Sequence, residues 1–217
     1  MWVFRLQLRR FAASKNAAFM VIGALLLGIA FLGTGSPTEN NVRGYFLTLT
    51  MLFALFSTSL SSQIPRDVLT LSKPVKRKRV LMEHMGAVLT VSTTALLAGS
   101  LIVGTKASPW DVSKGVVMAL EYLLAFSAVG VLIGTVLKGW ARGTASVTAG
   151  FALLFIPMGL TLLGKTGSLW PFLIPTLGPF LTVIEYIPIP KGFLYAAASS
   201  AIYFSAAAVV YGRSDVR

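Results

Sequence analysis

The sequence contains no cysteine and few charged residues. Without cysteine, disulfide bonds and thiolate metal sites are excluded, and the chain is indifferent to redox conditions. Charged residues make up 12% of the 217 residues, whereas a soluble domain of this size has about 25%. Hydrophobic residues make up 55%. A surface this poor in charge does not suit water, so we expect most of the chain to face lipid.

Acidic residues are especially scarce, with 7 Asp and Glu against 19 Lys and Arg, and the formal net charge is +12. In a soluble protein this excess would suggest nucleic acid as a partner. Here the basic residues lie mainly in short connections between apolar blocks, as expected beside anionic lipid headgroups. We therefore expect membrane lipid, and no nucleic acid, as a partner.

Signatures of enzymes are also missing. A single histidine, His84, excludes a HExxH zinc site, and no G-x-S-x-G elbow is present. The aspartates Asp67, Asp111 and Asp215 fall in connections or tails, so no intramembrane aspartate pair is available. We expect His84 to lie near the lipid headgroups, with a ligand role as the alternative. No catalytic, cofactor-binding or metal-binding residue is predicted.

Six apolar blocks are long enough to cross a membrane, because about 30 Å of hydrocarbon requires roughly 17 to 25 helical residues. The predicted spans are 17–33, 44–63, 80–104, 115–137, 144–164 and 192–211. The first block is longer than a signal-peptide core, and no clear A-x-A cleavage site follows it. We predict an all-α, polytopic membrane protein that forms a single transmembrane domain over residues 1–217.

The distribution of basic residues predicts the orientation. Segments 1–16, 64–79 and 138–142, together with the C-terminal tail, hold 14 of the 19 Lys and Arg residues. The connections on the alternate face hold the other five, and basic residues favour the cytoplasmic face. Both termini are therefore expected in the cytoplasm.

Residues 159–166, GLTLLGKT, match the phosphate-binding pattern G-x-x-x-x-G-K-[ST]. That pattern binds phosphate when it forms an open loop between a strand and a helix. Here its variable positions are mostly leucine, and the predicted topology places its end on the outer face, where ATP is scarce. We interpret the match as a coincidence at a Leu- and Gly-rich helix end, and expect no ATPase site in this chain.

The segment 168–191 is apolar but unusually rich in proline. Five of the ten prolines of the chain lie here, at positions 171, 175, 179, 188 and 190. Each proline inside a helix removes a hydrogen bond and costs roughly 3 kcal/mol, so a continuous span is disfavoured. Broken helices can enter a membrane where protein or water covers them. The segment is predicted to be a re-entrant hairpin on the outer side.

The N-terminal segment, MWVFRLQLRRF, has the pattern of an interfacial helix. Phe4, Leu8 and Phe11 form one helical stripe, and Arg5 and Arg9 lie beside it. Such a helix can lie among the headgroups with its apolar side toward the hydrocarbon. The alternative is a basic leader whose arginines only fix the topology.

One acidic residue, Glu121, lies clearly within a predicted span. Acidic groups inside a membrane are costly and indicate function by default. The alternative is that Glu121 lies near the outer interface and contacts serine or threonine, for example in the polar run 90–94. In the same span, Gly130 and Gly134 form a small-xxx-small pair, which we expect to pack within the subunit rather than at a dimer interface.

The connection after the second span, QIPRDVLTLSKPVKRKRVLMEHMG at 63–86, is predicted to contain a separately bounded short helix. Pro65 suits a first helical turn, and Pro74 disfavours helix just before itself. A basic connection alone is explained by topology. A short, partly apolar cytoplasmic helix containing Val68, Leu69 and Leu71 is better explained as a docking element for a soluble partner.

With these parts in this order, the sequence resembles the permease subunits of ABC-2-type transporters. The resemblance covers the order of parts and two motifs, LSKPVKRKRVLMEHMGAVL at 71–89 and YFSAAAVVYGRSDVR at 203–217. It implies a prokaryotic inner-membrane protein that works as a homodimer with two ATPase subunits, with ATP and Mg on those partners. It also implies that nucleotide-driven closure pushes on a coupling helix. By position, that coupling role falls on Pro65, Arg66, Asp67, Val68, Leu69, Leu71, Lys73 and Pro74.

Three functions are compatible with these patterns. The first is the permease subunit of an ATP-driven exporter, with the first, second and fifth spans lining the path, as the resemblance implies. The second is an ion-driven secondary carrier, which would depend on Glu121. The third is a non-transporting membrane scaffold or assembly factor.

Overall fold

The structure is a computed structural model that describes residues 2–33, 38–64, 77–164, 169–184 and 187–213, and its elements are α-helices. They are α1 (Trp2–Ala12), α2 (Lys15–Leu32), α3 (Glu39–Ser62), α4 (Arg77–Gly104), α5 (Pro109–Val136), α6 (Gly139–Leu162), α7 (Trp170–Leu173), α8 (Leu177–Val183) and α9 (Ile189–Arg213). Six of them, α2 to α6 and α9, are long and apolar enough to cross a membrane. The prediction of an all-α fold with six such helices is confirmed.

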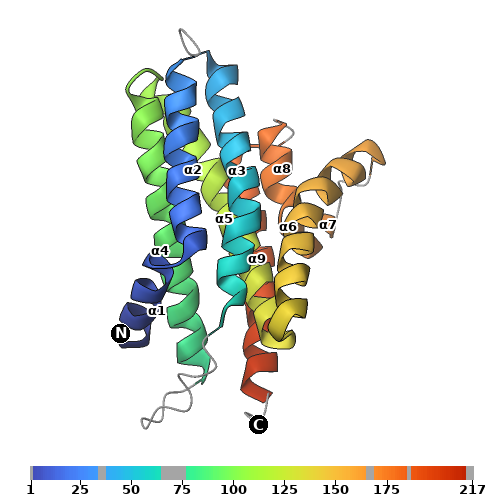
Figure 1. Cartoon of the computed structure of the whole chain (residues 1–217). Helices are drawn as coiled ribbons and strands as arrows, with labels where there is room; N and C mark the ends of the chain where they lie inside the picture. Colours follow the sequence, from blue (N-terminus) through green and yellow to red (C-terminus); the bar gives the residue numbers. More distant parts are fainter. Residues whose placement is uncertain (1, 34–37, 65–76, 165–168, 185–186, 214–217) are drawn as a thin grey trace.

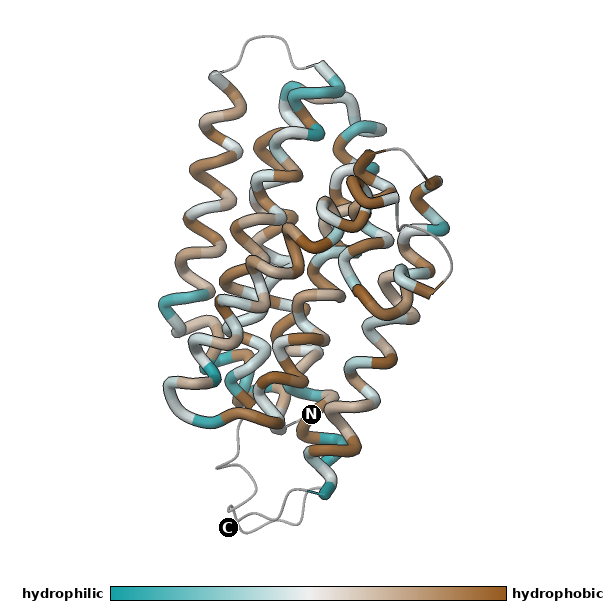
Figure 2. The backbone as a smooth tube through the Cα atoms, turned by 90° about the vertical axis from the view of Figure 1, so that its right-hand side faces the viewer, coloured by the Kyte–Doolittle hydropathy of each residue, from teal (hydrophilic) through white to brown (hydrophobic). Residues whose placement is uncertain are grey.

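The six long helices form an up-and-down bundle (Figure 1). One end, here called the α1 end, carries α1, the start of α4 and the C-terminal turns of α9. The opposite end carries the first turns of α3 and α5. Hydrophobic positions dominate the middle of the long helices, and hydrophilic ones gather toward their ends (Figure 2). This distribution suits a protein whose middle lies in hydrocarbon.

The long helices begin two to six residues earlier than the apolar blocks predicted. The reason is that helix caps recruit polar residues that hydropathy leaves out. Ser14 caps α2 by accepting a hydrogen bond from the Ala17 N–H, and Thr38 caps α3 in the same way. Ser108 caps α5, and Pro109 occupies the first helical turn, where its missing N–H has no cost.

Helices α3 and α5 pack closely along much of their length because glycines on α5 let the two backbones approach. A Cβ atom on Gly130 would overlap the Ser61 hydroxyl, and one on Gly134 would overlap the Ser62 carbonyl. Farther along, the hydroxyls of Ser57 and Ser127 lie 3.2 Å apart across the same interface. The prediction that the two glycines pack within the subunit is confirmed.

Helix α6 contains Pro157 in its interior. Proline has no N–H, so the carbonyl four residues earlier, on Leu153, loses its helical donor. That carbonyl accepts a hydrogen bond from the Thr176 hydroxyl at 2.5 Å. Thr176 immediately precedes α8, so the proline in α6 creates the attachment point for the short helices that follow.

The proline-rich stretch folds as two short helices rather than one long one. Pro171 lies in the first turn of α7, Pro175 lies between the two helices, and Pro179 lies in the first turn of α8. Helix α8 packs against α9 at Gly178 and Gly192, where Cβ atoms would meet the neighbouring helix. The expected interruption of the helix by proline is confirmed.

Candidate functional site

The predicted stripe on α1 contacts the protein. Phe4 and Leu8 are half-buried and Phe11 is fully buried, whereas Arg5 and Arg9 are exposed. All three apolar residues belong to, or pack on, the main hydrophobic cluster. The apolar side of α1 therefore lies against the bundle, mainly against α4.

The α1–α4 contact contains one charged anchor and one aromatic contact. The Phe4 N–H, in the first turn of α1, donates to Glu83 Oε2 at 2.7 Å, and Arg79 holds the other carboxylate oxygen at 2.8 Å. A carboxylate at a helix N-terminus satisfies an N–H group that has no partner within the helix and interacts favourably with the helix dipole. The Phe11 ring meets His84 edge-on at 5.2 Å between centroids. The sequence did not reveal this role of Glu83, because the contact joins residues 79 positions apart.

His84 is a packing residue in this structure. Its side chain is buried, and its Nε2 lies 2.8 Å from the Ser61 carbonyl. The described residues contain no group of three His, Asp or Glu side chains suited to a metal ion. Gln7 is also buried on α1, and both of its side-chain amide atoms lack hydrogen bonds to the described residues. Gln7 lies three residues after Phe4 and four before Phe11, so it belongs to the same helical stripe. This spacing could have predicted from the sequence that Gln7 is buried.

The predicted coupling residues, Pro65 to Pro74, lie outside the described residues, but both flanks of the 65–76 connection are described. Ile64 is buried in a cluster with Leu81, Val131 and Tyr211. On the other flank, the Arg77 side chain donates to the carbonyls of Tyr211 and Gly212 at 3.4 and 3.3 Å. The guanidinium thereby caps the C-terminal end of α9, where positive charge is favourable. One flank of the connection thus shares a buried cluster with the last turns of α9, and the other flank is hydrogen-bonded to them.

Glu121 lies deep in α5, twelve residues after Pro109, or about 18 Å along the helix. Its side chain is fully buried, and neither carboxylate oxygen makes a hydrogen bond of ordinary geometry with a described residue. A polar neighbour of the carboxylate is the Thr182 hydroxyl of α8. A Cβ atom on Gly192 of α9 would overlap that hydroxyl and would lie 3.1 Å from Glu121 Oε2. Glu121 thus lies where α5, α8 and α9 meet.

The partners expected for Glu121 in the polar run 90–94 are wrong. The hydroxyls of Thr90 and Thr94 donate to carbonyls one turn earlier in their own helix, α4. The sequence could not identify Thr182 instead, because the contact depends on how α8 folds back onto the bundle.

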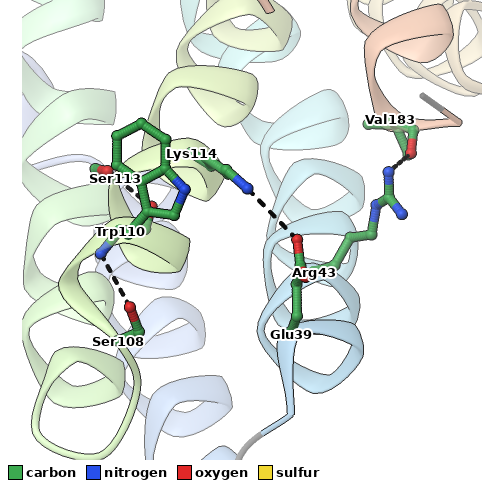
Figure 3. Close-up of polar contacts among 7 residues, drawn as sticks. All are labelled: Glu39, Arg43, Ser108, Trp110, Ser113, Lys114 and Val183. Carbon is green, nitrogen blue, oxygen red and sulfur yellow. Dashed lines mark hydrogen bonds and ion pairs between the residues drawn. The ribbon is translucent and has the colours of Figure 1, made fainter. Parts of the chain in front are cut away.

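A cavity of about 450 Å³ opens at the end opposite α1, between α3, α5, the end of α8 and the start of α9. Its charged residues come from the first two turns of α3 and α5. Lys114 Nζ lies 3.5 Å from Glu39, and the Arg43 guanidinium donates to the Val183 carbonyl (Figure 3). The other charged wall residue is Asp111, in the first turn of α5.

The residues of the phosphate-loop match do not form such a loop where they are described. Gly159 to Leu162 continue helix α6, and Gly164, with φ of 67°, follows its end. Lys165 and Thr166 lie outside the described residues. No strand precedes the match among the described residues, so the strand–loop–helix arrangement is not formed there.

The fold and the six apolar helices define a multi-pass, all-helical membrane protein. No protein-family model matches the chain, and no curated protein matches it significantly.

Proposed function

We propose that the chain is the permease subunit of an ATP-driven transporter of the ABC-2 type, acting as an exporter. In this proposal two copies form the translocation path, and two separate ATPase subunits bind ATP and Mg. The sequence motifs at 71–89 and 203–217 support it, together with six long apolar helices preceded by a short basic helix. The chain itself contributes no ATPase site.

One observation carries the proposal: the two residues that flank the 65–76 connection both lie at the C-terminal end of α9. Ile64 belongs to a buried cluster that includes Tyr211 of α9 and Val131 of α5, and Arg77 is hydrogen-bonded to the last turn of α9. A push on the connection would therefore reach α9 and α5 together. Coupling of nucleotide-driven closure to a permease requires such a mechanical link between a docking segment and the membrane helices.

The proposal also assigns positions relative to the membrane. The α1 end, which carries the basic residues of α1 and the first turn of α4, faces the cytoplasm of a prokaryotic cell, and both termini lie there. Helix α1 lies at the membrane interface with Arg5 and Arg9 toward the headgroups. Helices α7 and α8 form a re-entrant hairpin on the outer side.

Helices α2, α3 and α6 line the path in the proposed homodimer. The exposed apolar side chains on α2 and α6 support this assignment, because lipid or a second copy must cover them. They include Phe19, Leu26, Phe151 and Phe155.

The coupling role is tested with the proposed partner ATPase. The double variant Asp67→Arg and Leu69→Arg is co-expressed with it. We expect loss of the complex on affinity purification and loss of ATP turnover stimulated by the permease, because two like charges and a lost apolar contact disrupt the docking surface.

The matched control is Thr105→Arg, an exposed position at the opposite end of the bundle, which is expected to leave the complex intact. An unchanged complex and unchanged ATP turnover in the double variant would contradict the proposed coupling role. Solute flux by the purified chain alone, driven by a proton gradient in ATPase-free vesicles, would instead identify an ion-driven carrier.

A further inference from the structure

The cavity at the end opposite α1 has the size of a small-molecule site. Its volume of about 450 Å³ falls within the range of ligand-binding pockets, roughly 300–1,000 Å³. Apolar side chains line part of it, including Val42, Met118, Ile187 and Ile189. A ligand with a hydrocarbon body would bury apolar surface against these residues.

The charged residues in the cavity wall are two acidic and two basic side chains. The positive charges of Arg43 and Lys114 balance those of Glu39 and Asp111 in number, and both basic side chains are held by contacts shown in Figure 3. Asp111 has no ion pair with a described residue. The Glu121 carboxylate, when ionised, adds one further negative charge below the cavity.

Glu121 continues the side of α5 that lines the cavity. Asp111, Gly115 and Met118 are wall residues at helical spacing, and Glu121 follows Met118 by three positions. Thr182 is both a wall residue of the cavity and the polar neighbour of Glu121. The side chain of one threonine therefore lies between the cavity and the buried carboxylate.

A buried carboxylate that has no positively charged neighbour is unstable as an anion unless a positive charge approaches it. No described residue supplies that charge, because neither Glu121 oxygen has an ion-pair partner in the described part of the chain and its polar neighbour, the Thr182 hydroxyl, is uncharged. The apolar wall and the unmatched carboxylate together favour one ligand chemistry, a cationic head joined to an apolar body.

We propose that this cavity binds amphipathic organic amines, with the ligand's ammonium group directed past Thr182 toward Glu121 and its apolar body against Met118 and Ile189. This site is independent of the ATPase, and it lies on the opposite side of the bundle from the α1 end. If the cavity did not bind amines, the proposed permease function would be unaffected.

The test uses the purified full chain in phosphatidylcholine nanodiscs and two matched fluorescent probes. The probes are dansylcadaverine, which carries a primary ammonium, and its N-acetyl derivative, which is neutral but otherwise similar. We expect the dissociation constant of the cationic probe to be lower than that of the neutral probe by about tenfold or more. The variant Glu121→Gln should weaken binding of the cationic probe by about tenfold and leave the neutral probe unchanged.

Two further variants keep the result interpretable. Ile189→Trp fills the cavity from a half-exposed position and retains Glu121, so it should abolish binding of both probes even if Glu121→Gln does not fold. Glu83→Gln removes a carboxylate at the α1 end and should change neither dissociation constant. Equal affinity for the two probes, no saturable binding of the cationic probe, or unchanged binding in Ile189→Trp would overturn the inference.

Discussion

Gly130 and Gly134 set the distance between α3 and α5. At both positions the space that a side chain would need is occupied by the backbone or hydroxyl groups of α3. In a membrane, where apolar surface gains little from burial between helices, close backbone packing is a main source of helix association. These two glycines therefore stabilise the protein by allowing the backbones of α3 and α5 to pack closely.

The variant Gly130→Ala should destabilise the protein by about 1–3 kcal/mol, because the added methyl group forces α3 and α5 apart. The measurement is the midpoint of thermal unfolding in detergent. Gly159→Ala is the matched control, since Gly159 also lies inside a helix but has open space around it. The control should be neutral or slightly stabilising, because alanine favours helix more than glycine does. Equal midpoints for Gly130→Ala and wild type would show that α3 and α5 separate without cost.

At the scale of elements, α6 and the two short helices after it depend on each other. Pro157 releases the Leu153 carbonyl, and Thr176 supplies the replacement donor. Tyr203 of α9 donates to the Leu173 carbonyl at the end of α7, at 2.7 Å. Two side-chain hydroxyls thus fix the proline-rich stretch to helices on either side of it.

The variant Thr176→Val should destabilise the attachment of α8 to α6 by about 1 kcal/mol, the order measured for hydrogen bonds between membrane helices. Valine keeps the shape of threonine but leaves the Leu153 carbonyl without a donor. The expected result is faster hydrogen exchange at the amides of α7 and α8 than in wild type. Thr161→Val is the control, because its hydroxyl donates only to the Pro157 carbonyl within α6. Equal acceleration in both variants would contradict a specific role for Thr176.

The sequence predicted the features that depend on local chemistry. Six apolar runs predicted six long helices, and the prolines at 171, 175 and 179 predicted an interrupted segment. The first turns of the helices were missed because their residues are polar and their stability comes from caps such as Thr38 and Ser108. The site was less predictable. Glu121 stood out as an acid in an apolar run, but its neighbour Thr182 and the cavity above them result from long-range packing that no local pattern encodes.

At the scale of the whole molecule, the two ends of the bundle differ in their chemistry. The α1 end carries the basic first turn of α4 and the exposed arginines of α1, with Glu83 as the anchor between them. The opposite end carries the cavity and its mixed charges. This asymmetry, together with the positive-inside rule, is the basis of the proposed orientation.

The orientation is tested by labelling single cysteines on intact cells, which the native absence of cysteine makes direct. Lys78→Cys lies at the exposed start of α4 and should react with a membrane-impermeant maleimide only after the cells are opened. Thr105→Cys, just past the other end of the same helix, should react on intact cells. The reverse pattern would place the 65–76 connection outside the cell and contradict the permease proposal.

The position of the cavity has a practical consequence for inhibition. In the proposed orientation, the cavity opens on the outer side of the membrane, at the far end of helices about 42 Å long. A compound that fills it would act without crossing the bilayer, and it would not compete with nucleotide. Screening for such compounds could therefore use whole cells and molecules too polar to enter them.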